Sequence, residues 1–303
     1  MIFFGIEQYE ELARELANLA GGQGGTVLRK RFPDGEHYLR IEDEVNDRDV
    51  ALAGGTCDHD ATLELYDMAC AIVECGASTL TLVVPYFGYS TMERAVMRGE
   101  AVMAKNRARM LSSIPRAKLG NQILLLDLHS EGIPHYFEGT IRPFHVYAKP
   151  VIQKMARELA GDSFILGSTD AGRAKWVESL ANDLGVPAVF VFKRRISGES
   201  TEVTAVSASL EGETVVVYDD MIRTGGTLIN AAHAYREAGA GRLFAIATHG
   251  VFAGEAVDRI RASGLFEAVA VTDSHPNARQ PGVIVRSVAE LFVPYVERRR
   301  PAG

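Results

Sequence analysis

Cysteine is scarce in this chain, which has three cysteines in 303 residues. Three are too few for the set of disulfides that holds a small secreted domain together. Cys57 lies two residues before His59, but no second pair of ligands stands at a spacing that would complete a zinc site. Cys70 and Cys75 fall in a helix-like run, where we expect small core residues. Neither disulfides nor zinc are therefore expected to stabilise the fold.

Long apolar runs, a surplus of basic residues and a Gly-Lys dipeptide are missing as well. No run approaches the length of a membrane span, and the amino terminus lacks a signal-peptide layout, so we expect a cytoplasmic protein with no membrane partner. A net charge of −7 argues against nucleic acid as a partner, because backbone binding needs an excess of Lys and Arg. Without Gly-Lys there is no Walker A loop, so a nucleotide would be held in another way.

What the chain does have is a repeated alternation of short apolar runs and amphipathic stretches. Its length suggests about two domains, and 47% hydrophobic residues are enough for full cores. The runs predicted to be buried parallel strands are Leu80–Tyr86, Ile123–Leu128, Phe164–Gly167, Ala188–Phe192, Val215–Tyr218 and Leu243–Ala247. The predicted helices are Thr62–Glu74, Val151–Leu159, Lys175–Leu184 and Leu228–Ala238. This pattern predicts an α/β fold with two doubly wound, mainly parallel-sheet domains, 1–148 and 149–303, divided at the Pro-containing stretch 143–150.

The segment 215–227, VVVYDDMIRTGGT, predicts a site for a ribose phosphate. Two glycines permit backbone N–H groups to converge on a phosphate at the start of a helix near Leu228. Two threonines add hydroxyl donors, and two carboxylates at the carboxyl end of the strand can accept hydrogen bonds from vicinal sugar hydroxyls. The residues are Asp219, Asp220, Thr224, Gly225, Gly226 and Thr227. The alternative is an ordinary strand, turn and helix with a solvated pair of aspartates.

Six more motifs accompany this loop in order along the chain. They are Arg31–Glu36, Pro85–Tyr89, Asp127–Ser130, Ser168–Gly172, Lys193–Arg195 and Thr248–Phe252. Together with the loop, they make nearly the whole chain resemble the ribose-phosphate diphosphokinases, whose phosphoribosyl diphosphate (PRPP) loop is shared with type I phosphoribosyltransferases. The resemblance implies two domains of the type I phosphoribosyltransferase-like fold, with the last segment of the chain returning to the first domain. A transferase would share only the loop and the general fold.

The resemblance also implies an ATP site and a metal site. Phe32, Asp34 and Glu36 would lie on a loop that reaches across a subunit interface to the adenine and ribose of ATP, which makes the protein a homo-oligomer. By itself, the Pro-Asp-Gly within this loop would be a plain turn. His129 and Asp170, each after a predicted strand, would hold Mg²⁺ chiefly through the phosphates of ATP. A single histidine after a strand is otherwise more often a structural hydrogen-bonding residue.

Lys193 and Arg195 are the candidate catalytic cations. They precede the polar segment 198–201, which suits a flap that closes over phosphates and excludes water. Transfer of a diphosphoryl group needs cations around the nonbridging oxygens and the leaving AMP. No general base is evident, and the family relies on positioning and electrostatics. The alternative is a solvated basic turn.

Four departures from the family pattern concern the proposed substrate sites. Thr91 and Met92 replace an Arg-Gln pair expected to contact ATP, and the nearest cations in sequence are Arg94, which we assign to ATP binding, Arg98 and Lys105. The segment 131–138 differs from the usual stretch after the histidine. On the sugar side, arginine replaces the usual acid at position 223 and glycine replaces alanine at position 225. Arg223 adds positive charge beside the 5-phosphate pocket.

Three functions fit these residues. The first is transfer of the β,γ-diphosphoryl group of MgATP to ribose 5-phosphate, giving PRPP and AMP. The second is the same transfer to another acceptor such as ADP-ribose, which the extra charge of Arg223 would suit. The third is a regulatory paralogue that joins synthetase assemblies without turnover, and the retained His129, Asp170, Lys193 and Arg195 argue against it. A phosphoribosyltransferase is the remaining possibility.

Overall fold

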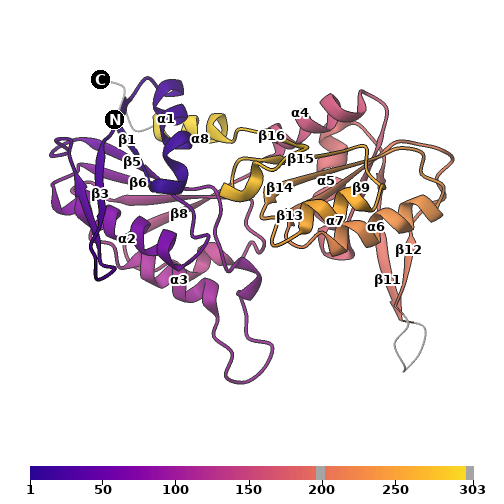
Figure 1. Cartoon of the computed structure of the whole chain (residues 1–303), viewed down its shortest axis with the longest axis horizontal. Coiled ribbons are helices and arrows are strands. Elements are labelled where there is room, and N and C mark those ends of the chain that lie inside the picture. Colours follow the sequence, from indigo (N-terminus) through magenta and orange to yellow (C-terminus); the bar gives the residue numbers. More distant parts are fainter. Residues whose placement is uncertain (196–201, 298–303) are drawn as a thin grey trace. The chain divides into compact units, whose positions relative to one another are not determined.

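The chain forms two α/β units. The computed structural model describes residues 1–195 and 202–297. Unit 1 comprises Met1–Tyr147 and the segment from Ser287, and unit 2 comprises Ala148–Arg286 (Figure 1). No helix in the described ranges is both long and apolar enough to cross a membrane.

Unit 1 is built on a parallel sheet with the strand order β2-β1-β5-β6-β7-β8. The strands are β1 (Ile2–Gly5), β2 (Gln23–Gly24), β5 (Asp49–Ala53), β6 (Thr79–Val84), β7 (Asn121–Leu126) and β8 (Ile141–Val146). Every residue of β6 and β7 is buried, because helices cover both faces of a parallel sheet. The helices are α1 (Glu10–Leu19), α2 (His59–Glu74), α3 (Met103–Ser112) and α8 (Ala289–Glu297). An antiparallel hairpin, β3 (Val27–Arg31) and β4 (His37–Ile41), is a separate two-stranded sheet.

Unit 2 is built on a second parallel sheet, with the strand order β10-β9-β13-β14-β15-β16. The strands are β9 (Ile165–Ser168), β10 (Ala188–Val189), β13 (Val215–Ile222), β14 (Leu243–Gly250), β15 (Ala268–Thr272) and β16 (Val283–Arg286). The helices are α4 (Lys149–Ala160), α5 (Ala174–Leu184), α6 (Gly226–Glu237) and α7 (Ala256–Ala262). Strands β11 (Val191–Arg195) and β12 (Glu202–Val206) form an antiparallel hairpin.

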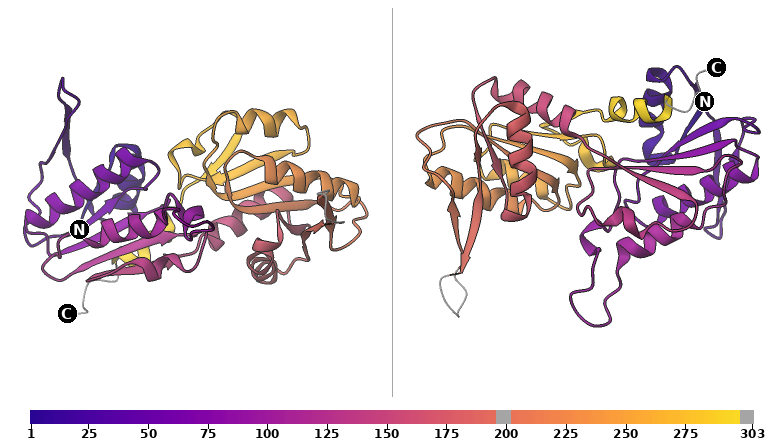
Figure 2. Two further views of the ribbon diagram at one scale, coloured as in Figure 1. Left: turned by 90° about the horizontal axis from the view of Figure 1, so that it is seen from below. Right: turned by 180° about the vertical axis from the view of Figure 1, so that it is seen from behind.

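The alternation of side chains along β13 explains why this sheet is covered on both faces. Val215 and Val217 belong to the core that contains the apolar residues of α6 and α7. Tyr218 points to the opposite face, where its ring stacks on Trp176 of α5. Helices consequently lie on both sides of the sheet, as the left view of Figure 2 shows. The predicted doubly wound α/β fold is confirmed.

Several local predictions were wrong. The run Ala188–Phe192 is not one buried strand: it divides into the short edge strand β10 and the start of the β11–β12 hairpin, where Phe192 is exposed. Strand β13 continues to Ile222, so the two aspartates lie inside it, and the next helix begins at Gly226. Cys70 is half-buried and Cys75, at the end of α2, is exposed, so neither is a core residue.

Candidate functional site: a phosphate loop and its surroundings

The phosphate loop, residues 223–227, joins β13 to α6 in unit 2. Gly225 is the residue before the first turn of α6 and has a φ of +80°, a conformation that costs about 1–2 kcal/mol for other residues. A Cβ atom at this position would also lie 2.8 Å from Cγ1 of Ile260 in α7. Glycine therefore suits both the backbone conformation and the closeness of α7 in this chain. Arg223, Thr224, Gly226 and Thr227 are exposed around this turn, so their groups are accessible to a ligand.

A segment that follows β14 holds the phosphate loop in place. The N–H of Phe252 donates to the carbonyl of Ile222 at 3.0 Å, and the N–H of Ala253 donates to that of Arg223 at 2.8 Å. Nη2 of Arg259 donates to the carbonyl of Thr224 at 2.7 Å. Sequence reasoning missed Arg259, because nothing in the local pattern of α7 indicates a partner 35 residues earlier.

The acidic pair precedes the phosphate loop, and Arg173 binds one of its members. Nη2 of Arg173 lies 2.5 Å from Oδ2 of Asp220, and the two side chains are only 17% and 6% exposed. Burial, followed by the charge of Asp220, raises the pKa of Asp219 well above its usual value, and Arg173 acts in the opposite direction. The pair is thus an oriented, partly neutralised group of carboxyls rather than two solvated aspartates. The predicted site did not include Arg173, whose partner is 47 residues away.

Asp170 lies at the end of β9, beside the same group. Its Oδ1 accepts hydrogen bonds from the N–H groups of Gly172 at 2.8 Å and Arg173 at 3.2 Å, which fixes its orientation at the start of the short 3-10 helix η4 (Ala171–Arg173). Oγ of the neighbouring Ser168 is buried and has no hydrogen-bond partner among the described residues. A buried polar atom of this kind marks a place where a bound polar ligand or ion would be satisfied.

Lys193 and Arg195 lie on β11, where their backbones pair with Thr204 and Glu202 of β12. The backbone positions of both candidate cations therefore lie on one hairpin, two residues apart. The proposed flap, residues 198–201, lies outside the described residues.

His129 belongs to unit 1, and the loop that carries it has an unusual backbone. Asp127 has a φ of +37°, and its N–H is held by the carbonyl of Val146 at 2.9 Å. The N–H of Leu128 donates to Nε2 of His145 at 3.0 Å, so this nitrogen must be unprotonated. Burial lowers the pKa of His145, in agreement with a neutral ring. His145, missed by sequence reasoning, thus positions the backbone of the predicted metal ligand.

The described part of the chain contains no group of three His, Cys, Asp or Glu side chains that could hold a metal ion. His129 and Asp170 belong to different units.

The predicted ATP-side residues of the hairpin are all exposed at its tip. The N–H of Phe32 donates to the carbonyl of Glu36 at 2.8 Å, and the N–H of Glu36 donates to Oδ1 of Asp34 at 3.1 Å, which closes an Asp-Gly turn. The ring of Phe32 is 47% exposed and meets that of Tyr38 edge to face, with 6.1 Å between centroids. Glu36 also lines a cavity of about 840 Å³ between the hairpin and α2. The tip therefore presents one aromatic face and two carboxylates.

The segment around Arg94 contains a second strained residue. Tyr89 has a φ of +62°, and the guanidinium of Arg107 lies over its ring at 4.9 Å from the centroid. Gly88 is needed there, because a Cβ atom would lie 2.0 Å from the carbonyl oxygen of Thr56. Arg94 itself is 80% exposed and lies 3.7 Å from Glu93. Arg107 is an additional cation near the Thr91-Met92 departure that the sequence did not indicate.

Comparison with known proteins agrees with the geometry. Residues 1–114 match the N-terminal domain of ribose phosphate pyrophosphokinase, and residues 177–284 match the phosphoribosyl synthetase-associated domain. A ribose-phosphate pyrophosphokinase of Synechococcus elongatus is 36% identical over 288 residues, which cover 93% of this chain and 85% of the relative. The chloroplastic ribose-phosphate pyrophosphokinase 1 of Oryza sativa subsp. japonica is 33% identical and matched over 93% and 71%. The crystal structure of phosphoribosylpyrophosphate synthetase from Mycobacterium smegmatis superposes with a TM-score of 0.84 at 27% identity and covers 98% of this chain and 97% of that one.

Proposed function

The chain belongs to the ribose-phosphate pyrophosphokinase family, and we propose that it transfers the β,γ-diphosphoryl group of ATP to the anomeric hydroxyl of ribose 5-phosphate, giving PRPP and AMP. The observation that carries this proposal is the phosphate loop with its acidic pair, in a chain that is similar to these enzymes over 93% of its length. The site residues and their roles are proposed together with this activity.

Unit 2 binds the sugar phosphate in this account. The backbone and hydroxyl groups of Thr224, Gly225, Gly226 and Thr227 receive the 5-phosphate at the amino terminus of α6, where the helix dipole favours an anion. Asp219 and Asp220 accept hydrogen bonds from the ribose hydroxyls. Because Arg173 holds the carboxylate of Asp220 at 2.5 Å, this acceptor is oriented before the sugar arrives.

The transfer step requires neutralisation of charge more than proton removal. The anomeric oxygen attacks the β-phosphorus and its hydroxyl proton is released to water, the bond to the oxygen shared with the α-phosphorus breaks, and AMP leaves with that oxygen. Lys193 and Arg195 donate hydrogen bonds to the nonbridging oxygens while the negative charge on these oxygens changes. These contacts lower the barrier without a general base.

His129 and Asp170 would hold Mg²⁺, which would arrive bound to the phosphates of ATP. The orientation of Asp170 by two backbone N–H groups and the unsatisfied Oγ of Ser168 support a polar ligand at the end of β9. When bound, the ion supplies charge neutralisation at the phosphates. The side chains at both positions only hold and orient that complex.

The hairpin tip supports a shared ATP site in a homo-oligomer. Phe32 offers an exposed ring for stacking on adenine, while Asp34 and Glu36 offer acceptors for the ribose hydroxyls. Arg94, exposed, is assigned to the phosphates. We assign ATP binding to residues 1–148, sugar binding and the catalytic cations to 149–303, and the protein to the cytoplasm, where its low cysteine content fits.

Release of AMP from MgATP tests this function. The purified protein is given ribose 5-phosphate, ADP-ribose or no acceptor, and products are identified by mass. We expect AMP and PRPP with ribose 5-phosphate and little AMP without an acceptor. Equal AMP release in all three reactions would indicate simple hydrolysis and would refute the proposal.

Transfer to ADP-ribose is a second candidate because Arg223 is exposed beside the phosphate loop. A guanidinium there can pair with an extra phosphate group. Arg223→Asp, which introduces the acid usual in the family, should then raise the preference for ribose 5-phosphate over ADP-ribose. An unchanged ratio of kcat/KM values would remove Arg223 from acceptor choice.

A further inference from the structure

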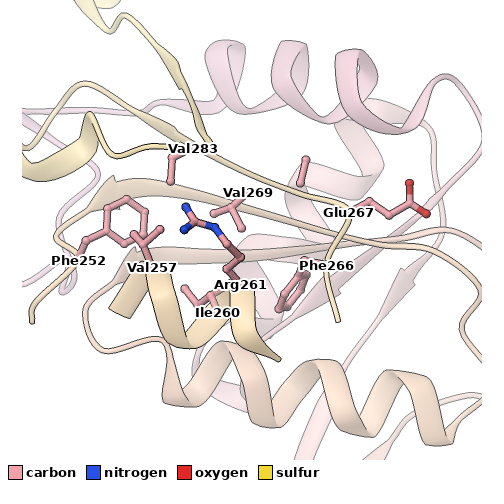
Figure 3. Close-up of a pocket in the computed structure, with 10 residues that line it drawn as sticks. Phe252, Val257, Ile260, Arg261, Phe266, Glu267, Val269 and Val283 are labelled. Atoms are coloured by element: carbon pink, nitrogen blue, oxygen red, sulfur yellow. The ribbon is translucent and has the colours of Figure 1, made fainter. Parts of the chain in front are cut away.

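A second cavity lies in unit 2 beside α7. Its volume is about 210 Å³, and six apolar side chains form most of its wall: Phe252, Val257, Ile260, Phe266, Val269 and Val283 (Figure 3). For comparison, an apolar cavity of about 150 Å³ accommodates a benzene molecule. The cavity therefore has room for a ligand of one ring.

The cavity lies between the short helix α7 and the sheet edge formed by β15 and β16. The helix spans only Ala256–Ala262, whereas β15 and the edge strand β16 continue beside it. Val269 and Val283 are direct neighbours across these two strands, and both remain only partly buried against the core. A bound apolar group would cover apolar surface that the fold leaves exposed in this concave place. Such burial contributes favourable free energy to binding.

One cation faces this apolar wall. In Figure 3 the guanidinium of Arg261 lies between the side chains of Val257 and Val269. Nη2 donates to the carbonyl of Pro281 at 2.6 Å, and Nη1 lies 3.3 Å from the exposed Asp258. These contacts use two of the five N–H donors of a guanidinium.

Glu267 also lines the cavity, and its carboxylate would repel a bound anion. Arg242 binds it through two N–H donors, at 2.8 and 2.6 Å, and thereby lowers the pKa of Glu267. Its negative charge is thus already compensated by a partner. Arg261 also has a partner, the exposed Asp258, but its guanidinium keeps further N–H donors, which are complementary to a carboxylate.

The cavity wall is connected directly to the phosphate loop. Ile260, one wall residue, is the side chain against which Gly225 packs. Phe252, another, donates its N–H to the carbonyl of Ile222 and has a φ of +41°, a strained conformation for a residue other than glycine. A ligand that contacts both side chains would restrict the two residues that support the loop from below.

We propose that this cavity binds a small apolar carboxylate of about one ring, with the ring against the valines and the carboxylate on Arg261, and that its occupancy stabilises the phosphate loop. The effect on sugar phosphate binding rests on the proposed function. Binding to the cavity and stabilisation of the loop backbone do not.

Benzoate is the probe for binding, measured by calorimetry on the full chain without substrates. We expect saturable binding at least about tenfold tighter than that of neutral benzamide, and an about tenfold loss in Arg261→Met, because a charge-assisted hydrogen bond is removed. Arg157→Met, which removes an arginine paired with exposed Asp162 elsewhere in unit 2, is the matched control and should leave binding unchanged. No saturable binding, or equal binding by Arg261→Met, would overturn the site.

A variant in which a larger side chain fills the cavity tests whether the ligand binds there. Val269→Phe, or Val283→Phe if the first variant does not fold, places a ring where the ligand would lie and should abolish binding. Retained benzoate binding by a folded plugged variant would place the ligand elsewhere and refute the proposal. If a second copy of the chain covered this face, benzoate would fail to bind the wild type while the plug changed the oligomeric state, which would equally overturn it.

Hydrogen exchange tests the connection to the loop. Saturating benzoate should slow exchange in the peptide 222–227 several-fold, and the plugged variant should not respond. Ribose 5-phosphate and benzoate should also change each other's affinity by one common factor, because linkage is reciprocal. Benzoate binding without slower exchange would refute the connection, whereas failure of ribose 5-phosphate to bind would count against the proposed function alone.

Discussion

The buried ion pair of Arg173 and Asp220 allows a quantitative test of how the acidic pair is held. Arg173→Met keeps most of the side-chain volume but removes the cation. With the side chains 17% and 6% exposed, the carboxylate cannot be rescued fully by water. Removal of one partner of a buried ion pair costs about 3–5 kcal/mol, whereas removal of an exposed pair costs about 0–1 kcal/mol. We therefore expect unit 2 to lose about 3 kcal/mol or more at neutral pH.

The pH dependence of this loss has a definite sign. Arg173 opposes the raised pKa of Asp219, so without it the carboxyl pair will hold a proton to higher pH in the folded state than in the unfolded chain. The folded variant then binds more protons than the unfolded one, and its stability falls as the pH rises. The destabilisation should be smaller at about pH 5 than at about pH 8.

Urea denaturation followed by tryptophan fluorescence measures this effect in unit 2 specifically. Trp176 is the only tryptophan of the chain, and it stacks on Tyr218, one residue before the acidic pair, with 4.0 Å between ring centroids. Arg157→Met again serves as the control, since Arg157 is 45% exposed and pairs with the exposed Asp162, although it also donates to the carbonyl of Leu184 at 2.9 Å. A loss in Arg173→Met no larger than that of the control, or a loss independent of pH, would refute the reasoning.

Three further predictions concern single positions. Gly225→Val should weaken ribose 5-phosphate binding about tenfold, because its φ of +80° and the nearby Ile260 oppose a branched side chain larger than the alanine usual in the family; unchanged affinity by calorimetry would contradict this role. Lys193→Ala should reduce kcat by about 100-fold or more and leave ribose 5-phosphate affinity intact, since its contact forms in the transition state; normal turnover would remove it from the mechanism. Burial lowers the pKa of folded His145, so the wild type should lose stability as pH falls through about 6.5, and His145→Gln should lack that loss; parallel Tm profiles would count against it.

Apolar runs were sufficient to predict much of the fold. Strands β6 and β7 are buried on both faces, so their sequences are mostly apolar and were found within two residues at each end. The same rule failed at Ala188–Phe192, because an apolar run at a sheet edge can leave the sheet and continue as a hairpin. Local hydrophobicity does not encode which strand lies at the edge.

The phosphate loop was predictable because its chemistry is contiguous in sequence. Gly225 has a positive φ, and the acidic pair precedes it by a few residues, so one short window contains the whole motif. Arg173, Arg259 and His145 were not predictable, because each acts on a partner between 17 and 47 residues away, and a single sequence contains no signal for such a contact. The three-dimensional structure was needed to show how the predicted residues are positioned.

Transfer of a labelled anomeric oxygen tests the central claim most directly. Ribose 5-phosphate carrying a heavy oxygen isotope on its anomeric carbon is converted with MgATP, and the products are analysed by mass. The account predicts that the label is retained in PRPP, between the sugar carbon and the β-phosphorus, and that AMP is unlabelled. Formation of AMP and free pyrophosphate without labelled PRPP would contradict it.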